Sequence, residues 1–197
     1  YGLMARITRL QAEIAGTTLL FDTDLVQRAP DVVRSETALF QGRQAELQAE
    51  IALLENRRMQ RRQEFEEGEV ERETATATLA VVTEERALVE PLVRRGIEPA
   101  ASLLTIRRSE AELQGRIVRA EAAMSRIETS LGEIDQEIAA QRARFRSAAL
   151  TDLAIATAEL AALRPALPAL ESRAARAAVR APVRGVVNRL HRVTLGS

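Results

Sequence analysis

The side chains that most often carry enzymatic chemistry are scarce in this sequence. It contains no cysteine and no lysine, and its single histidine is His191. These absences exclude disulfides, thiolate metal sites, cysteine nucleophiles, lysine Schiff bases, a P-loop lysine and any lysine-attached cofactor. An active site needs several acid, base or nucleophilic groups that converge, and we expect a surface or packing role for the lone His191. We therefore predict no catalytic residues, no cofactor and no metal site.

The remaining reactive side chains are arginines and carboxylates in equal number. The sequence has 28 basic and 28 acidic residues, and its formal net charge is zero. A balanced chain has no overall field that favours nucleic acid, so we expect no nucleic-acid partner. Most of these charges should lie on solvated helix faces, where an i,i+4 pair contributes roughly 0.2–0.5 kcal/mol. Aromatic residues make up only 3% of the chain, a composition typical of long helices and coiled coils.

The elements that position these charges begin with a short amphipathic helix. Over residues 1–16, apolar residues recur at spacings of four, three and four, and Gly16 can end the helix. Residues 17–29 break this period, which predicts a packed connection. No apolar run approaches the roughly 20 residues that a membrane-spanning helix needs.

Residues 30–178 are predicted to form a long antiparallel coiled-coil α-hairpin. Pro30 suits the first turn of the outgoing helix. The apolar seam of that helix comprises Phe40, Leu47, Ile51, Leu54, Phe65, Ala75, Leu79, Val82, Val89 and Val93, and the seam of the returning helix comprises Leu113, Ile117, Ala120, Met124, Ile127, Leu131, Ile134, Ile138 and Phe145. The outgoing seam is interrupted at Arg58, Arg61, Gly68, Arg72 and Arg86. Arg58, Arg61 and Arg72 are register devices, or they reach outward to solvent, or the register slips at these positions.

The turn "RRGIEP" fixes how the two helices fold back on each other. Gly96 can take the left-handed conformation that ends a helix, and Pro99 suits the start of the next helix. Folding about a tip at residues 94–99 pairs Leu54 with Ile138 and Gly68 with Met124. Prolines at 165 and 168 predict a kink near 165–168, where the hairpin proper ends. The first helix should pack beside these final turns and give three helices at the base.

The segment "RAPVRGVV" lies in residues 179–197, where alternating apolar residues flank a Pro182–Gly185 turn. The pattern predicts two short strands. Because such a small hairpin is marginal alone in water, it should complete a sheet with strands from elsewhere.

This segment resembles the second half of the lipoyl-like motif in the haemolysin-D family of membrane fusion proteins, the periplasmic adaptors of type I secretion systems. The matching residues are Arg180, Ala181, Pro182, Gly185, Val187, Thr194 and Gly196. Leu92, Gly96 and Ile97 are similar to the turn at the tip of the family's hairpin. In this family the hairpin interrupts the lipoyl-like sandwich, so its first half would precede Tyr1 and a β-barrel would follow Ser197.

The resemblance implies a mostly α fold: a long hairpin, a short third helix at its base and a terminal half-lipoyl β-segment. It implies a non-enzymatic connector between an inner-membrane ABC transporter and a TolC-like outer-membrane channel. The chain would be the periplasmic portion of an inner-membrane-anchored protein, and the assembled system would be a homo-oligomer, a hexamer.

The resemblance and the geometry of a rod place the contacts with the channel at the tip. The expected contact residues are Leu88, Leu92, Arg94, Arg95, Gly96, Ile97, Pro99 and Leu103. We expect Ile97 and one of the two leucines at 103 and 104 to be exposed. The two arginines either contact a partner or cap the helix C-terminus.

The alternative interpretation is a structural coiled-coil rod or scaffold protein. It explains the heptads, but it explains neither "RAPVRGVV" nor the sharp turn halfway along the chain.

Overall fold

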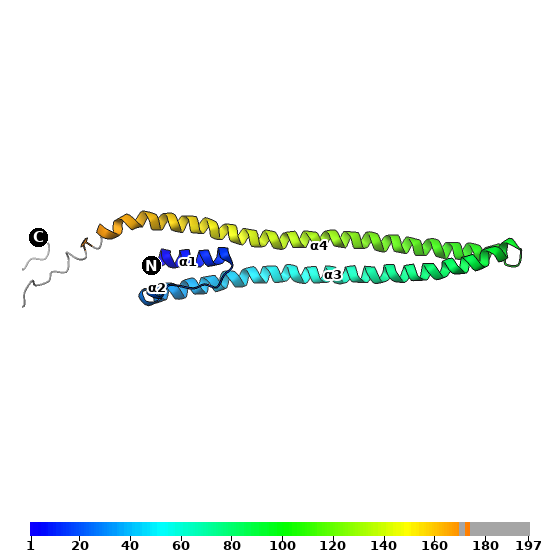
Figure 1. Ribbon diagram of the computed structural model, residues 1–197, viewed down its shortest axis with the longest axis horizontal. Helices are drawn as coiled ribbons and strands as arrows, with labels where there is room; N and C mark the ends of the chain where they lie inside the picture. The colour runs from blue at the N-terminus through cyan, green and yellow to red at the C-terminus, as the bar shows by residue number, and fades with distance from the viewer. Residues whose placement is uncertain (170–171, 174–197) are drawn as a thin grey trace, which may run out of the picture.

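The computed structural model describes residues 1–169 and 172–173, and in this part the chain is an elongated helical rod (Figure 1). Its elements are α1 (Gly2–Ala15), α2 (Thr23–Arg28), α3 (Pro30–Arg94), α4 (Ala100–Leu163) and a 3₁₀ turn (Arg164–Ala166). The predicted long α-hairpin is confirmed. No strand occurs in the described part, and the predicted half-lipoyl segment, residues 179–197, lies outside it.

The helices α3 and α4 run antiparallel along the rod, in the register that the sequence predicts (Figure 1). Leu54 packs against the buried cluster of Ile51, Ile134 and Ile138. A Cβ atom added to Gly68 would lie 2.9 Å from Cγ of Met124. Both contacts were expected from folding the chain about Gly96. A glycine facing a long methionine lets the two backbones keep their spacing at this point.

Arg58 and Arg61 of the α3 seam reach outward and leave the register intact, whereas the Nε atom of Arg72 is buried. The Arg58 guanidinium bonds Asp135 on α4 at 3.1 Å, and Arg61 bonds Glu64 at 2.6 Å. Their side chains are 49% and 39% exposed. The aliphatic stems thus cover the seam while the charged ends stay in water.

At the base of the rod, α1 lies between α3 and α4 (Figure 1). Leu10, Ala149 and Ala156 are completely buried there, and Leu3 packs against them. Gly16 has φ 66°, the left-handed conformation that ends α1. We call residues 1–56 and 134–163 the base, and residues 57–133 the outer hairpin.

The connection from 17 to 29 contains a helix that the sequence analysis did not predict. α2 is capped by Asp22, whose side chain accepts a hydrogen bond from the Asp24 amide at 2.9 Å. Arg28 pairs with Asp24 at 2.7 Å, and Leu25 is buried at 4% exposure. A cap, an i,i+4 ion pair and one buried leucine make a single short helix stable where the apolar period is broken.

α4 gives way to the 3₁₀ turn at Arg164, and Pro165 lies inside this turn. Because proline has no amide hydrogen, the regular α-helical bonding cannot continue through it. The sequence predicted the end of the hairpin at this proline. None of the helices in the described residues has the length and apolarity of a membrane span.

Candidate docking site at the hairpin tip

The outgoing helix ends in a Schellman motif that contains the residues resembling the family's turn. The Ile97 amide donates to the Leu92 carbonyl and the Gly96 amide to the Val93 carbonyl, both at 3.0 Å. Gly96 has φ 71°, as the sequence predicted. These bonds satisfy carbonyls that the last turn of a helix leaves free. The spacing of Leu92, Gly96 and Ile97 therefore has a structural cause, independent of any partner.

Two prolines and one arginine complete this turn. Pro91 lies in the last turn of α3, and its carbonyl accepts hydrogen bonds from the backbone amide and the Nε of Arg95, the latter at 3.2 Å. Pro99 is the N-cap residue of α4, with extended backbone. For Arg95 the structure supports capping, because its guanidinium binds the helix C-terminus.

Large apolar side chains of the tip remain exposed to solvent. Leu88 is 72% exposed, Ile97 65% and Leu104 66%. Leu92 and Leu103 are half-buried. Of the two neighbouring leucines it is therefore Leu104 that is exposed. Leu53 and Val118, away from the tip, are exposed to a similar degree, so it is the position of these side chains at the end of the rod that sets them apart.

Charged side chains at the tip form a small network across the hairpin. The Glu90 carboxylate lies 3.8 Å from Arg94 and 3.5 Å from Arg107 of α4. Deeper in the seam, Arg86 bonds Glu110 at 2.9 Å, and Glu110 is only 8% exposed. Sequence reasoning missed Glu110, although it lies three residues before Leu113 and so continues the seam spacing.

The structure thus brings together the predicted tip residues 88–103 at one end of the rod (Figure 1). The residues of the lipoyl-like motif, Arg180, Ala181, Pro182, Gly185, Val187, Thr194 and Gly196, lie outside the described residues, as does His191. Within residues 1–169 and 172–173, no three His, Cys, Asp or Glu side chains are arranged to bind a metal ion.

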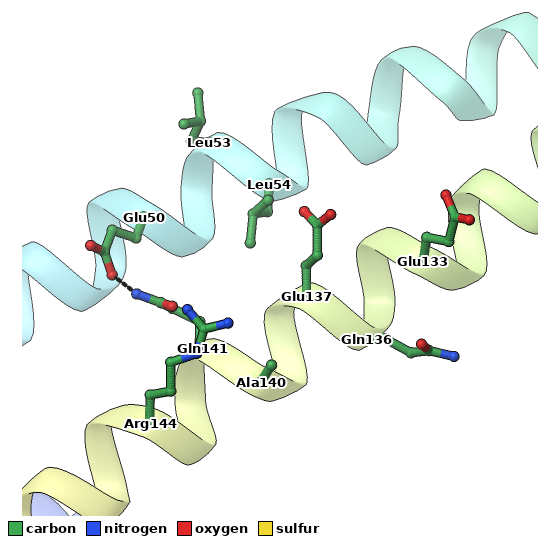
Figure 2. A pocket seen from close by; sticks show the side chains of 9 residues that line it. All are labelled: Glu50, Leu53, Leu54, Glu133, Gln136, Glu137, Ala140, Gln141 and Arg144. Atoms are coloured by element: carbon green, nitrogen blue, oxygen red, sulfur yellow. Dashed lines mark hydrogen bonds between the residues drawn. The ribbon is translucent and has the colours of Figure 1, made fainter.

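A groove of about 720 Å³ lies away from the tip, on the flank of the hairpin between α3 and α4. Figure 2 shows Glu50 of α3 meeting Gln141 of α4 across it, joined by a hydrogen bond. Its lining is largely carboxylates and amides, with Leu53 exposed at its edge.

Comparison with known proteins supports the family assignment. The family described as "AprE, long alpha-helical hairpin" matches residues 1–173. The chain is 28% identical over 192 residues to the type I secretion system membrane fusion protein PrsE of Rhizobium meliloti (strain 1021). This alignment covers 94% of the chain and 44% of PrsE, so the chain spans less than half the length of this relative.

A solved structure has the same fold. The crystal structure of the soluble domain of LipC, a membrane fusion protein of a type I secretion system, superposes with a TM-score of 0.80. The sequences are 23% identical, and the match covers 93% of this chain and 71% of that one. The chain therefore belongs to the AprE long alpha-helical hairpin family.

Proposed function

We propose that this hairpin is the periplasmic arm of an adaptor that links an inner-membrane ABC exporter to a TolC-like outer-membrane channel for type I protein secretion. The tip of the hairpin contacts the channel, and the exporter lies toward the base. The role is that of a connector and not of an enzyme.

The observation that carries this proposal is the apolar tip at the far end of a long rod. α3 has 65 residues and α4 has 64, so each spans about 95 Å at 1.5 Å per residue. Leu88, Ile97 and Leu104 remain exposed at this end. The rod holds these groups far from the base, and the Schellman motif fixes the backbone beneath Ile97.

The finer features of the proposal concern the rest of the assembly. Residues 179–197 supply the second half of a lipoyl-like β-motif, and the arm belongs to a protein anchored in the inner membrane. Several copies, six by resemblance, surround a common conduit. The resemblance of residues 180–196 to the family motif and the match to the family over residues 1–173 support these features.

The test is secretion of the cognate substrate by cells that carry variants of the full-length protein. Ile97→Asp places a charge in the exposed apolar contact, and we expect it to abolish secretion. Gly96→Val forces a β-branched residue into a left-handed backbone, which strains the turn, and we expect a similar loss. Arg94→Glu should weaken secretion less, because a charge at the rim of an interface contributes modestly.

Crosslinking from position 97 separates docking from folding. A photoreactive group at this position should capture the outer-membrane channel, whereas one at Val118, which is 63% exposed on α4, serves as the matched control. Normal secretion by the Ile97→Asp variant together with no crosslink at position 97 would show that the channel is engaged elsewhere.

A further inference from the structure

Charged side chains are sealed inside the base, where the three helices meet. Arg9 and Glu13 of α1 are 3% and 4% exposed. Arg9 bonds Glu13 at 2.5 Å and Glu36 of α3 at 2.6 Å. Arg43 of α3 lies 3.4 Å from the other Glu13 oxygen, and that oxygen has no hydrogen bond.

The network continues to α4 through Asp152. This carboxylate lies 3.7 Å from Arg43 and 3.4 Å from Arg6 of α1. The Arg43 guanidinium also stacks over the ring of Phe145, 5.3 Å from its centroid. The charge network therefore joins all three helices. Its signs alternate from one contact to the next, in the order Arg6, Asp152, Arg43, Glu13, Arg9 and Glu36.

Arg9 lies at the centre of this network. Burial by itself lowers the pKa of the Arg9 guanidinium. The hydrogen bonds to Glu36 and Glu13, together with the charges of these carboxylates, outweigh that effect and raise the pKa above its ordinary value. Arg9 thus stays charged, and its partners must remain within reach of it.

The apolar contacts of α1 discriminate poorly between neighbouring positions along the rod. The large apolar side chains that it packs into the base are all leucine or isoleucine, namely Leu3, Ile7, Leu10 and Ile14, and Ala5 and Ala12 are buried beside them. They pack on Ala149, Leu153 and Ala156 of α4. Sliding α1 by one turn, about 5 Å, replaces one large aliphatic side chain by another over the same alanines. The contacts of the large aliphatic side chains are therefore replaced by similar ones in such a slide.

The charges respond differently to the same slide. A displacement of about 5 Å would break the bond from Arg9 to Glu36 and the contact between Glu13 and Arg43. Arg9 and Glu13 would keep each other, but each would lose its partner on α3 while it remains buried, which is unfavourable. Buried polar groups specify the register of coiled coils in the same way.

We infer that the charge network is a positioning device that fixes where α1 lies along α3 and α4. Figure 1 shows the N-terminus and the end of α4 at the same end of the rod. The position of α1 therefore sets the spacing between Tyr1 and Leu163. In the proposed function these two ends lead to the two halves of the lipoyl-like sandwich, so their spacing decides whether the halves meet; this consequence rests on the proposed function.

The inference is tested by measuring a distance. The chain has no cysteine, so spin labels can be attached at cysteines introduced at Met4 of α1 and Arg144 of α4, both exposed. These positions are offset along the rod, and pulsed electron paramagnetic resonance reports their separation. The parent chain should give one narrow distance.

The decisive variant replaces the α1 pair by apolar side chains of similar size, Arg9→Met with Glu13→Leu. We expect the helix content to be kept and a second distance to appear, displaced by about 5 Å, one helical turn. Glu36→Gln, which keeps an acceptor for Arg9, should give the same second distance in a smaller fraction of molecules.

The control is a pair of the same residue types and spacing on the surface. Arg62 and Glu66 of α3 are 67% and 61% exposed. Replacing them by Met and Leu should leave the narrow distance unchanged.

A single unchanged distance in the Arg9→Met, Glu13→Leu variant overturns the inference, because apolar packing alone would then fix the position of α1. A featureless spread of distances also overturns it, since the charges would hold α1 in place without selecting its position. Neither result depends on secretion, so it leaves the proposed function standing.

Discussion

The base and the outer hairpin bury their side chains in different ways. In the base, Leu10, Ala149 and Ala156 have no exposed surface. In the outer hairpin the least exposed apolar residue that the structure describes is Ala75, at 4%, and Leu113 retains 9%. Two helices share only one narrow seam, whereas a third helix covers the side of that seam.

The charged side chains, like the apolar ones, are more deeply buried in the base than in the outer hairpin. Arg9 and Glu13 form an i,i+4 pair that is almost completely buried, and Arg62 and Glu66 form one that is mostly exposed. The residue types and the spacing are identical in the two regions. Whether an arginine–glutamate pair is exposed or buried is therefore decided by the helices that pack around it and not by the pair itself.

The largest effect that would sharpen this comparison is expected from Arg9→Met. It leaves the carboxylate of Glu13 buried without its main partner, and breaking a buried ion pair in this way costs about 3–5 kcal/mol. Arg62→Met should change the free energy of unfolding by less than about 0.5 kcal/mol. Urea unfolding followed by circular dichroism measures both. Equal losses would mean that burial at the base does not distinguish the two pairs.

A smaller difference is expected between two leucines truncated to alanine. Leu10→Ala leaves a cavity enclosed by three helices and should cost about 3–4 kcal/mol. Leu113→Ala lies in the two-helix seam, where neighbouring side chains and solvent can fill the space, and should cost about 2 kcal/mol. Comparison of the two unfolding midpoints checks the order, and a larger loss for Leu113→Ala would contradict it.

The seam of the outer hairpin contains one charged contact that can be broken. Arg86→Met removes the partner of Glu110, which is 8% exposed. Because an unpaired carboxylate remains in the seam, we expect a loss of about 2 kcal/mol. Replacing Glu110 by leucine in the Arg86→Met variant should restore most of the lost stability, since this position of the seam then has only apolar side chains. Failure of this second change to recover stability would show that the pair itself stabilises the seam.

The smallest effects are expected at two helical glycines of the outer hairpin. Gly132 has nothing within 4 Å of an added Cβ, so Gly132→Ala should stabilise α4 by about 0.5–1 kcal/mol. At Gly68 the same atom would lie 2.9 Å from Met124. Gly68→Ala should therefore gain less, because the methionine must move. Thermal unfolding of both variants gives the comparison, and equal gains would mean that Met124 adjusts freely.

Much of the fold could be predicted because it follows from local patterns. The heptad spacing of apolar residues indicated both long helices, and Gly96 indicated where the chain turns. The register followed from these two facts alone, as the contacts of Gly68 with Met124 and of Leu54 with Ile138 confirm. α2 was missed because a six-residue helix has too few residues to show a period.

The candidate site was predicted less completely. Leu92, Gly96 and Ile97 form one turn, which a sequence motif can specify because its hydrogen bonds are local. The exposure of Leu104 in place of Leu103 could not be predicted, since it depends on which of the two faces α3.

The sequence by itself determined the helices, the turn and their register, because each depends on residues close together in the chain or on a single repeating period. Only the tertiary structure decided which charges are buried. Arg9 and Glu13 look like any surface pair until α3 and α4 enclose them, and Glu110 gains its ion-pair partner only when the hairpin places Arg86 across from it. Burial is a property of the neighbours that surround a side chain, and those neighbours come from distant parts of the chain.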